Sequence, residues 1–417
     1  MKDKIILHVD INNFYASAAL LYNPDLKDKY MVICGNPEKR HGVVLAKNER
    51  AKKAGIKTGD TLNEARKKVK NLYALPPDFK KYSYLSKKAI EIYKQYTPKV
   101  ESFGLDECWL DVTETADLFG GGLKIAEEIR SKMKEKVGLT VSVGVSFTKV
   151  FAKLGSDMKK PDAVTVIDKK NYKNIIWNLP VGDMLYVGRS AVKKLDDMGL
   201  YTIGDVANFS KDILVSAFGK NGSKLYEIAN GADDEEVSTA NEAVLPESVS
   251  NGATTERDID NVYDAKSLIY SLSEVVAYRL RKYGLSALGI SIGIRDNKLS
   301  YYSRQAKLTN PTDDAKRIAD CAFNILQKNY VFGKDNPLRM ITVGTYNLVN
   351  GLYDLQLNLF ESDEEKTCCL NSKLDGLRNK YGYGVLKRAI EINPDFTCDT
   401  REIEDGYVPF DKRNGND

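Results

Sequence analysis

The stretch IILHVDINNFYAS, residues 5–17, opens the chain as an apolar run that ends in an acid and passes at once into a helical pattern. The run predicts a buried strand with Asp10 at its end, and Asn12 or Asn13 can cap the helix that follows. A carboxylate at a strand end, beside the first amides of a helix, suits a cation and a triphosphate. The alternative is an ordinary acidic residue that precedes a helix.

A second acidic point, Asp106-Glu107, lies between Gly104 and the strand-like run Cys108–Val112. Carboxylates at strand ends hold divalent cations for phosphoryl or nucleotidyl transfer, so we expect these acids to share a site with Asp10. Neighbouring side chains of a regular strand point to opposite faces. Both acids therefore reach one site only if the backbone turns after Gly104; otherwise they are solvated loop acids.

A third pattern, SFTKVFAKLGSDMKKP at residues 146–161, predicts a helix that begins near Thr148. Lys160 stands just past this helix and before Pro161, where its ammonium group can reach a phosphate. Taken alone, the lysine is a basic helix end that neutralises the helix dipole.

Composition limits the class of protein. The 417 residues suggest two to four domains, and a composition of 42% hydrophobic and 29% charged residues is ordinary for a globular protein. No apolar run is long enough to span a membrane, and no secretion signal is visible. The six cysteines have no framework spacing, so we expect reduced thiols in the cytoplasm. Two histidines leave little material for a histidine-rich zinc site or a histidine-centred triad.

Charge is distributed unevenly along the chain. Residues 22–101 contain 19 Lys and Arg against 9 Asp and Glu, whereas residues 354–417 contain 9 against 14. A basic front fits a protein that holds a polyanion at one end. Solvated lysine-rich helix faces would give the same pattern, so charge favours nucleic acid only weakly.

Hydrophobic periodicity divides the chain into units. Up to residue 170, the order strand, helix, two strands, helix and strand follows a ferredoxin-like layout, with the lysine-rich segment 22–78 inserted. Residues 171–240 are expected to be helical, and a polar stretch from residue 232 leads into the linker 241–247. Residues 248–350 combine two helices with a hairpin-like strand pair and a further strand. The expected fold class is therefore α+β and multidomain.

Two further segments suggest contacts with partners. Segment 187–206 resembles a helix-hairpin-helix, in which Gly188 would allow the backbone to approach a phosphate; an ordinary helical hairpin explains it equally well. Segment 356–360 (QLNLF) places Leu and Phe in a polar tail, which usually indicates partner binding. The alternative there is a strand or helix that packs back on the domain.

These patterns, in this order, resemble the Y-family translesion DNA polymerases over about residues 3–360, and KNERAKKAGIKTGD at residues 47–60 agrees with them. The DINNFYAS form of the first pattern is closest to the bacterial polymerase V catalytic subunit, within the polymerase V and polymerase IV group. The resemblance implies a right-hand polymerase with a ferredoxin-like palm, small fingers, a helical thumb with a helix-hairpin-helix, and an α+β little finger. The implied boundaries are palm 1–21 and 79–170, fingers 22–78, thumb 171–240, linker 241–247, little finger 248–350 and C-terminal tail 351–417.

The resemblance also implies roles for single residues. Asp10 and Asp106 would bind two Mg²⁺ ions, for which Mn²⁺ can substitute, while Glu107 completes the primer-side site and the carbonyl of Ile11 assists. Tyr15 would be the steric gate that excludes ribonucleotides. Further implied contacts are, for the nucleotide, Asn13, Phe14, Tyr15, Lys52 and Lys160; for DNA, Gly188, Arg189, Thr254, Thr255, Arg257, Arg295 and Arg304; and for the bacterial sliding clamp, Gln356, Leu357, Leu359 and Phe360.

The chain departs from the family pattern in the fingers. Lys52 stands where many relatives have Arg, and Glu49 stands where many have Tyr. A lysine lacks the bidentate fork of arginine, and an ionised glutamate cannot donate a hydrogen bond to phosphate. The chain therefore differs from those relatives at two positions where the fingers would contact the triphosphate.

The implied function is template-directed, low-fidelity DNA synthesis in translesion synthesis, DNA repair and damage tolerance, including the SOS response. The implied partners of a monomeric cytoplasmic chain are primer–template DNA, dNTPs and the sliding clamp, without a membrane; an accessory subunit or recombinase filament stays open. Two rivals remain. A palm-type nucleotidyl cyclase would need neither the hairpin nor the clamp peptide. A catalytically silent DNA-binding or clamp-recruited scaffold would not need the intact acids Asp10, Asp106 and Glu107.

Overall fold

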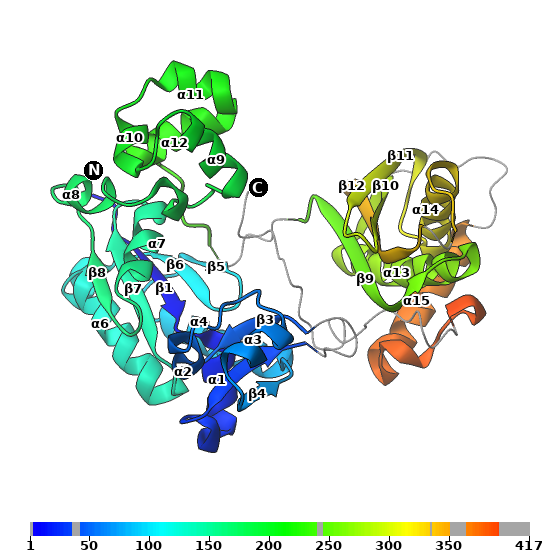
Figure 1. Ribbon diagram of the computed structural model, residues 1–417, viewed down its shortest axis with the longest axis horizontal. Helices are drawn as coiled ribbons and strands as arrows, with labels where there is room; N and C mark the ends of the chain where they lie inside the picture. Colours follow the sequence, from blue (N-terminus) through cyan, green and yellow to red (C-terminus); the bar gives the residue numbers. More distant parts are fainter. Residues whose placement is uncertain (1–2, 36–41, 240–244, 334–335, 351–363, 392–417) are drawn as a thin grey trace. The chain divides into compact units, whose positions relative to one another are not determined.

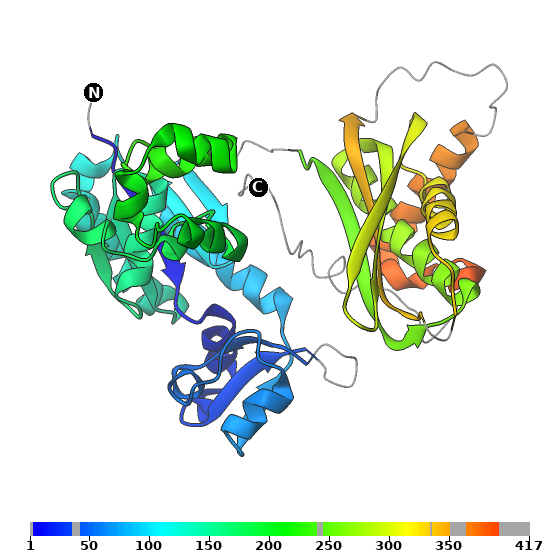
Figure 2. The same ribbon diagram turned by 45° about the horizontal axis from the view of Figure 1, so that its top comes forward.

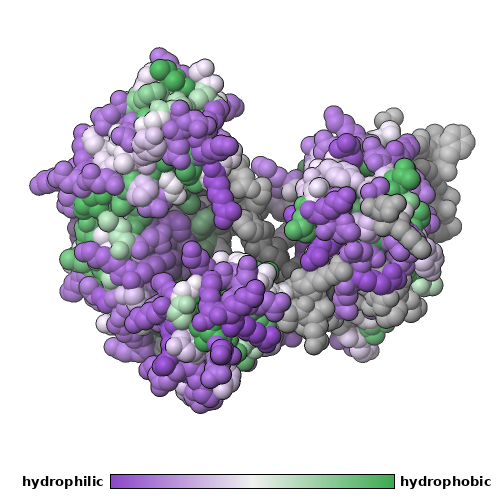
Figure 3. Space-filling model, viewed as in Figure 1, coloured by the Kyte–Doolittle hydropathy of each residue, from purple (hydrophilic) through white to green (hydrophobic). Residues whose placement is uncertain are grey.

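The computed structural model describes residues 3–35, 42–239, 245–333, 336–350 and 364–391, with the backbone alone for residues 364–369. The chain forms two compact units that divide near residue 243 (Figures 1 and 2). The faces visible in Figure 3 are mainly hydrophilic, with small and separate hydrophobic patches. No helix in the described ranges is both long and apolar enough to cross a membrane.

The first unit is built on a five-stranded sheet. Its strands are β1 (Ile6–Ile11), β5 (Val100–Phe103), β6 (Glu107–Asp111), β7 (Val141–Ser146) and β8 (Val164–Val166). The strand order is β5-β6-β1-β7-β8, in which β5, β6, β1 and β7 take the order of a ferredoxin-like fold and β8 adds a parallel edge (Figure 1). The predicted layout is therefore confirmed.

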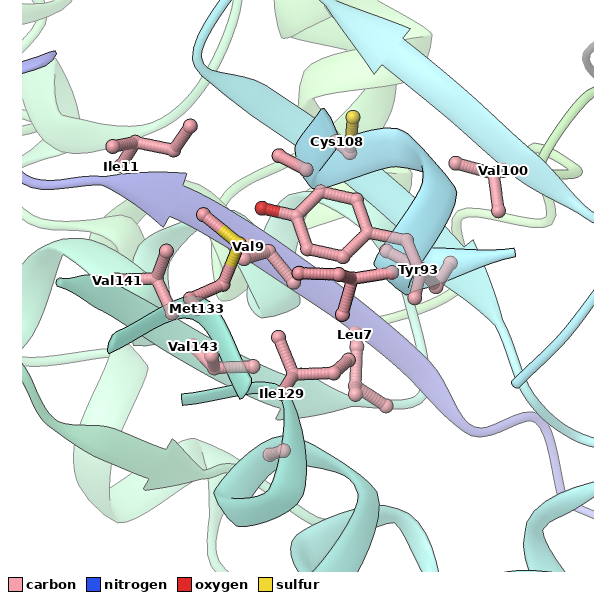
Figure 4. Packing of buried hydrophobic residues seen from close by; sticks show 14 of the residues in the cluster. Leu7, Val9, Ile11, Tyr93, Val100, Cys108, Ile129, Met133, Val141 and Val143 are labelled. Carbon is pink, nitrogen blue, oxygen red and sulfur yellow. The ribbon is translucent and has the colours of Figure 1, made fainter. Parts of the chain in front are cut away.

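Helices cover both faces of this sheet. They are α1 (Phe14–Tyr22), α4 (Phe79–Tyr93), α5 (Ala116–Phe119), α6 (Gly122–Lys132), a π-helical turn (Met133–Val137) and α7 (Lys149–Met158). Helices α4 and α6 pack on the face where Leu7, Val9 and Ile11 of β1 join the main hydrophobic core (Figure 4). Since side chains alternate along a strand, His8 and Asp10 face the other side, which α7 covers.

Helix α7 lies directly on the backbone of β7. A Cβ added to Gly144 would stand 1.8 Å from the carbonyl oxygen of Ala152, and one added to Gly155 would stand 3.2 Å from the Cα of Gly144. Thr148 caps the start of the helix, where its hydroxyl accepts a hydrogen bond from the amide of Phe151. Only glycine at position 144 permits this approach, which fixes the distance of α7 from the sheet.

The inserted segment 22–78 forms its own small sheet, ordered β3-β2-β4. Its elements are a 3₁₀ turn (Pro24–Leu26), β2 (Tyr30–Cys34), β3 (Val44–Lys47), α2 (Glu49–Lys53), α3 (Leu62–Lys68) and β4 (Leu72–Leu75). A separate cluster of buried residues, including Val32, Val44 and Leu62, holds the helices against the strands. The segment is thus a folded insertion rather than a long loop.

A helical segment follows the sheet, as the sequence predicted. Its helices are α8 (Tyr172–Ile176), α9 (Arg189–Asp197), α10 (Ile203–Ala207), α11 (Lys211–Phe218) and α12 (Lys220–Ala229). Their shared core includes Val150 and Phe151 of α7. Helix α7 therefore connects the helical segment to the sheet through one continuous set of buried side chains.

The first part of the polar stretch 232–247 packs on the first unit, although its composition predicted a linker. Lys149 is 3% exposed and donates hydrogen bonds to Glu101 Oε1 (2.7 Å) and Glu235 Oε1 (2.9 Å). The amide of Ser238 donates to Glu101 Oε2 (2.8 Å), and Val237 is buried in a small apolar cluster. A buried lysine with two carboxylate partners therefore anchors residues 235–238.

The second unit is a four-stranded antiparallel sheet, ordered β11-β10-β12-β9, with two helices packed on one face. Its elements are β9 (Ser248–Ile259), α13 (Val262–Tyr283), β10 (Leu285–Asp296), β11 (Tyr301–Thr312), α14 (Ala315–Asn329) and β12 (Leu338–Asn350). All of them except β9 follow the predicted periodicity. Strand β9 was missed because SVSNGATTERDI lacks a sustained apolar alternation.

The second unit continues past residue 350, where the sequence placed the start of a tail. Helix α15 (Glu364–Tyr381) and two 3₁₀ turns (Tyr383–Val385 and Ala389–Glu391) belong to it. Arg378 of α15 is 5% exposed and donates to Glu274 of α13 at 3.0 Å, and Arg388 contacts the same carboxylate. The buried Arg378 ion pair attaches α15 to α13, and the half-exposed Arg388 attaches the segment between the two 3₁₀ turns to the same helix.

Candidate active site

Asp10 and Glu107 lie directly opposite each other on two neighbouring strands. The antiparallel register of β1 and β6 pairs Asp10 with Glu107 and His8 with Trp109. Directly opposite residues share a face of the sheet, so both carboxylates project toward α7. Asp10 is only 6% exposed. The fold thus brings together two acids that are far apart in the sequence.

Asp106 reaches the same place through a turn. Gly104 has a φ of 80°, a conformation that favours glycine, and residues 104–106 connect β5 to β6. The amide of Ile11 donates a hydrogen bond to the carbonyl of Asp106 at 3.0 Å, which ties the turn to the end of β1. The condition that the sequence imposed, a backbone turn after Gly104, is therefore met.

Two lysines contribute positive charge beside these acids. Lys160 Nζ lies 2.6 Å from Asp10 Oδ2 and 2.7 Å from Asp157 Oδ1. Lys153 of α7 forms an ion pair with Glu107 Oε2. The sequence predicted Lys160 but not Lys153, because a lysine within an amphipathic helix carries no signal until the strand opposite it is known.

Burial and mutual repulsion shift the acids away from their usual pKa values. Burial, followed by the charge of Glu107, raises the pKa of Asp10 to about 7 and that of Asp106 to about 6. Burial also acts to raise the pKa of Glu107, but His8 and Lys153 outweigh it and lower this pKa to about 2. Carboxylates with raised pKa values beside an ionised neighbour are typical of a site that gathers charge for a cation.

The donor set suits a magnesium site that a substrate completes. Asp10, Asp106 and Glu107 offer only oxygen ligands, which Mg²⁺ and Mn²⁺ prefer. Within the described ranges, no group of three or more His, Cys, Asp or Glu side chains, these three acids included, is placed so that it could hold a metal ion by itself. Mg²⁺ is usually bound by one or two carboxylates and by substrate phosphates rather than by an all-protein cage. The three acids therefore fit a catalytic metal site better than a structural one.

The residues after Asp10 place a helix N-terminus beside the acids. Asn13 has a φ of 48° and directly precedes α1, whose first amides have no acceptor within the helix. The side chain of Asn13 donates to Glu49 Oε1 at 2.7 Å, and Lys52 Nζ lies 3.8 Å from the same oxygen. Glu49 therefore links the start of α1 to α2. The sequence showed only that Glu49 stands where many relatives have Tyr, and it did not predict this contact.

Tyr15 is held by aromatic neighbours. Its ring stacks on Tyr82 of α4 with 4.2 Å between centroids and 11° between planes, and it meets the ring of Phe79 edge to face with 6.0 Å between centroids. Tyr82 is only 2% exposed, so it forms a fixed support. Phe14, which precedes Tyr15 in the chain, is buried in the main hydrophobic core. The sequence identified Tyr15 but not Tyr82.

The candidate DNA contacts of the helical segment lie at an exposed helix start. Gly188 immediately precedes α9, and nothing lies within 4 Å of a Cβ built on it. Arg189, the first residue of α9, is exposed. Both positions are open to an approaching phosphate.

In the second unit, the structure corrects one expected DNA contact. Thr255 is 4% exposed, and its hydroxyl donates to the carbonyl of Arg339 at 3.2 Å. It therefore stabilises the pairing of β9 with β12 and is not available on the surface. Thr254 is half-buried, and Arg257 is exposed and forms an ion pair with Asp264 at 3.0 Å.

The two arginines of the predicted hairpin point to opposite faces of the sheet. Arg304 pairs in register with Ile292, which is buried under the helices, so both lie on the helix side. There Arg304 lines a groove of about 660 Å³ between β11 and α14. Arg295 is exposed, and its guanidinium lies over the ring of Tyr301. The clamp-peptide residues Gln356, Leu357, Leu359 and Phe360 lie outside the described residues.

Three family models match successive parts of the chain. The model described as the impB/mucB/samB family matches residues 9–157, and the C-terminal domain of that family matches residues 246–359. A model described as DNA polymerase-iota, thumb domain, matches residues 183–233. The matched ranges include most of the five-stranded sheet with its insertion, helices α9 to α12 of the helical segment, and the sheet of the second unit with α13 and α14, but not β8, α8 or α15.

Relatives match over nearly the full length. A DNA polymerase IV of Acetivibrio thermocellus is 46% identical over 390 residues, which are 93% of this chain and 97% of the relative. One of Clostridium acetobutylicum is 33% identical over 395 residues, or 93% and 98% of the two chains. Among solved structures, a Y-family DNA polymerase chimera matches 83% of this chain and 99% of its own, with a TM-score of 0.73 and 22% identity, which is evidence for the fold.

Proposed function

The chain belongs to the impB/mucB/samB family of Y-family DNA polymerases, and we propose that it extends primers on a DNA template by low-fidelity translesion synthesis. The family that the sequence suggested is confirmed, and the relatives bear the name DNA polymerase IV. The observation that supports the proposal best is the convergence of Asp10, Asp106 and Glu107 beside Lys160 and the start of α1. A nucleotidyl cyclase would leave the thumb and C-terminal matches unexplained.

In this proposal the domains keep the boundaries expected from the sequence. The palm is 1–21 with 79–170, the fingers are 22–78, the thumb is 171–240, and the little finger begins at residue 248. We extend the little finger to residue 391, because α15 packs on α13. The chain would work in the cytoplasm on primer–template DNA and dNTPs.

The residues of the site have distinct tasks in the proposed reaction. Two bound Mg²⁺ ions, or Mn²⁺, would lower the pKa of the primer 3′-hydroxyl and neutralise the triphosphate. Asp10 and Asp106 would hold both ions with help from the carbonyl of Ile11, and Glu107 would hold the primer-side ion. Lys160 would turn its ammonium to the triphosphate, whose oxygens the first amides of α1 also bind.

Substrate contacts outside the metal site would position rather than read the nucleic acid. Tyr15 would lie under the sugar and exclude a 2′-hydroxyl. Lys52 and Asn13 would approach the triphosphate from the fingers and from α1. Gly188, Arg189, Thr254, Arg257, Arg295 and Arg304 would contact backbone phosphates, which gives affinity without sequence preference.

Primer extension tests the proposed function. The full-length chain should extend a primed template with dNTPs and Mg²⁺, and it should continue past a lesion that stops a replicative polymerase. No extension on an undamaged template would refute the polymerase activity. Extension that always stops at lesions would refute the translesion role alone.

The Mg²⁺ requirement should rise as the pH falls from 8 to 6. With pKa values raised to about 7 and about 6, Asp10 and Asp106 take up protons in this range, and protons compete with the cation for the same oxygens. One competing proton would raise the Mg²⁺ concentration for half-maximal extension about tenfold per pH unit below the higher pKa. Single-turnover extension at saturating dNTP measures this Mg²⁺ concentration at each pH. A half-maximal Mg²⁺ concentration that stays constant from pH 8 to 6 would contradict the prediction.

We further propose that segment 356–360 binds the bacterial sliding clamp. Replacing Leu359 and Phe360 with Ala should abolish the stimulation of synthesis by the clamp and leave basal synthesis unchanged, since these side chains would fill a pocket on the partner. Val331→Ala, which truncates an exposed apolar residue elsewhere, is the matched control. Loss of basal synthesis together with stimulation would show that the segment packs on its own domain.

A further inference from the structure

The imidazole of His8 is buried beside the active-site acids and has no task in the reaction above. The side chain is 0% exposed and shares a face of β1 with Asp10. Its Nδ1 lies 2.8 Å from Ser156 Oγ, and its Nε2 lies 3.2 Å from Glu107 Oε2. The ring also packs against Trp109, with 5.1 Å between centroids. His8 therefore stands between a helix hydroxyl and a metal-site carboxylate.

The hydrogen-bonding options of this ring point to one arrangement. Nε2 is buried and has no well-aligned hydrogen-bond partner in the described part of the chain, so the nearby Glu107 carboxylate is the acceptor that an N–H there would use. The tautomer with Nε2–H is the one whose Nδ1 accepts the hydroxyl proton of Ser156. That hydroxyl also lies 2.7 Å from the carbonyl of Lys153, and its single proton can go to either acceptor; only donation to Nδ1 is compatible with the Nε2–H tautomer.

The carboxylate of Glu107 is thus contacted from two sides. His8 and Lys153 both approach Oε2, so together they set the rotation of the carboxylate and the direction of Oε1. Lys153 and Ser156 belong to α7, which the close approach at Gly144 holds on the sheet. A rigid helix and a buried ring therefore determine how Glu107 faces the site.

We propose that His8 is a positioning residue that holds the Glu107 carboxylate in the orientation needed to complete the primer-side metal site. The proposal rests on the proposed polymerase function. It explains why a polar ring occupies the centre of a strand whose other neighbours, Leu7 and Val9, are apolar. Groups that orient a metal ligand typically change metal affinity 10–100-fold when they are removed.

Two substitutions of His8 separate its two contacts. The amide of Gln reaches the position of Nε2, so His8→Gln keeps a donor toward Glu107; the shorter Asn reaches only the position of Nδ1, so His8→Asn keeps the contact with Ser156 alone. We expect His8→Asn to raise the half-saturating Mg²⁺ concentration about tenfold and to lower kcat, with the dNTP KM unchanged. His8→Gln should stay within about threefold of wild type, whereas loss of packing alone would affect both variants.

A binding measurement gives a readout independent of activity. Mn²⁺ titration followed by electron paramagnetic resonance, on the full chain with dNTP and a primer that lacks its 3′-hydroxyl, should show one of two ions weakened about tenfold in His8→Asn only. Equal effects of both variants, or a wild-type metal requirement in His8→Asn, would overturn the proposal. If His8→Asn does not fold, Ser156→Ala should lower the affinity for the same ion about threefold. Unchanged affinity in Ser156→Ala would also overturn the proposal. Wild-type chain that does not extend primers would refute the proposed function instead.

Discussion

Asp106→Asn should lower the rate of primer extension at least about 10³-fold, equivalent to roughly 4 kcal/mol of lost transition-state stabilisation. The amide keeps the shape of the side chain but removes a charged oxygen ligand that both cations would share. The variant is most informative because Asp106 lies in a turn, where the backbone carbonyl bonded to Ile11 does not depend on the side chain.

The same substitution should preserve or increase stability. The pKa of Asp106 is raised to about 6 in the folded chain from an ordinary value of 3.8. A carboxyl whose folded pKa is raised stabilises the fold below the unfolded pKa, and that contribution is lost as the pH rises through the folded value. At pH 8 the native state therefore carries the cost of a buried charge, which Asn removes.

Single-turnover extension and thermal unfolding at pH 8 check both parts of this prediction. Asp111→Asn is the matched control, because Asp111 ends β6, the strand that follows Asp106, and forms an ion pair with Lys99 at 3.3 Å, away from the site. The control should retain activity. Extension by Asp106→Asn within tenfold of wild type would remove Asp106 from the metal site, and a marked fall in melting temperature would show a structural role.

The parts of the molecule that the sequence could predict are those with local signals. The strand and helix across residues 5–22 follow from an apolar run and a capping segment, both within one stretch of chain. Strand β7 alternates valine with small residues, and the structure gives the reason: α7 needs Gly144 to reach the sheet. The ferredoxin-like order then places Asp10 and the hairpin acids on adjacent strands.

The parts that could not be predicted depend on which residues the fold brings opposite one another. His8 and Lys153 are unremarkable in the sequence and become informative only when β1, β6 and α7 meet at Glu107. Thr255 and Arg304 are polar residues whose facing is set by register, which a single-residue shift reverses. The ion pair that attaches α15 to α13 joins residues about a hundred positions apart, so no local pattern indicates it. The polar composition after residue 350 therefore predicted a tail.

Tyr15→Ala should reduce discrimination against ribonucleotides about 100-fold, because it removes a steric conflict with the 2′-hydroxyl. The structure adds a second position to this prediction. Tyr82 stacks on Tyr15 and is itself almost completely buried, so it fixes where the gate stands. Tyr82→Ala should therefore leave Tyr15 in place but mobile. We expect discrimination against ribonucleotides to fall about tenfold, which corresponds to the upper end of the free energy of one aromatic contact.

The ratio of kcat/KM for a dNTP and its ribonucleotide measures the effect of each substitution. Tyr84→Ala is the control, since Tyr84 lies on the same helix but is 52% exposed and outside the aromatic cluster. If Tyr82 acts only through Tyr15, the double variant should discriminate no worse than Tyr15→Ala alone. Additive losses would instead mean that Tyr82 contacts the sugar pocket independently, and unchanged discrimination in Tyr15→Ala would exclude the steric gate.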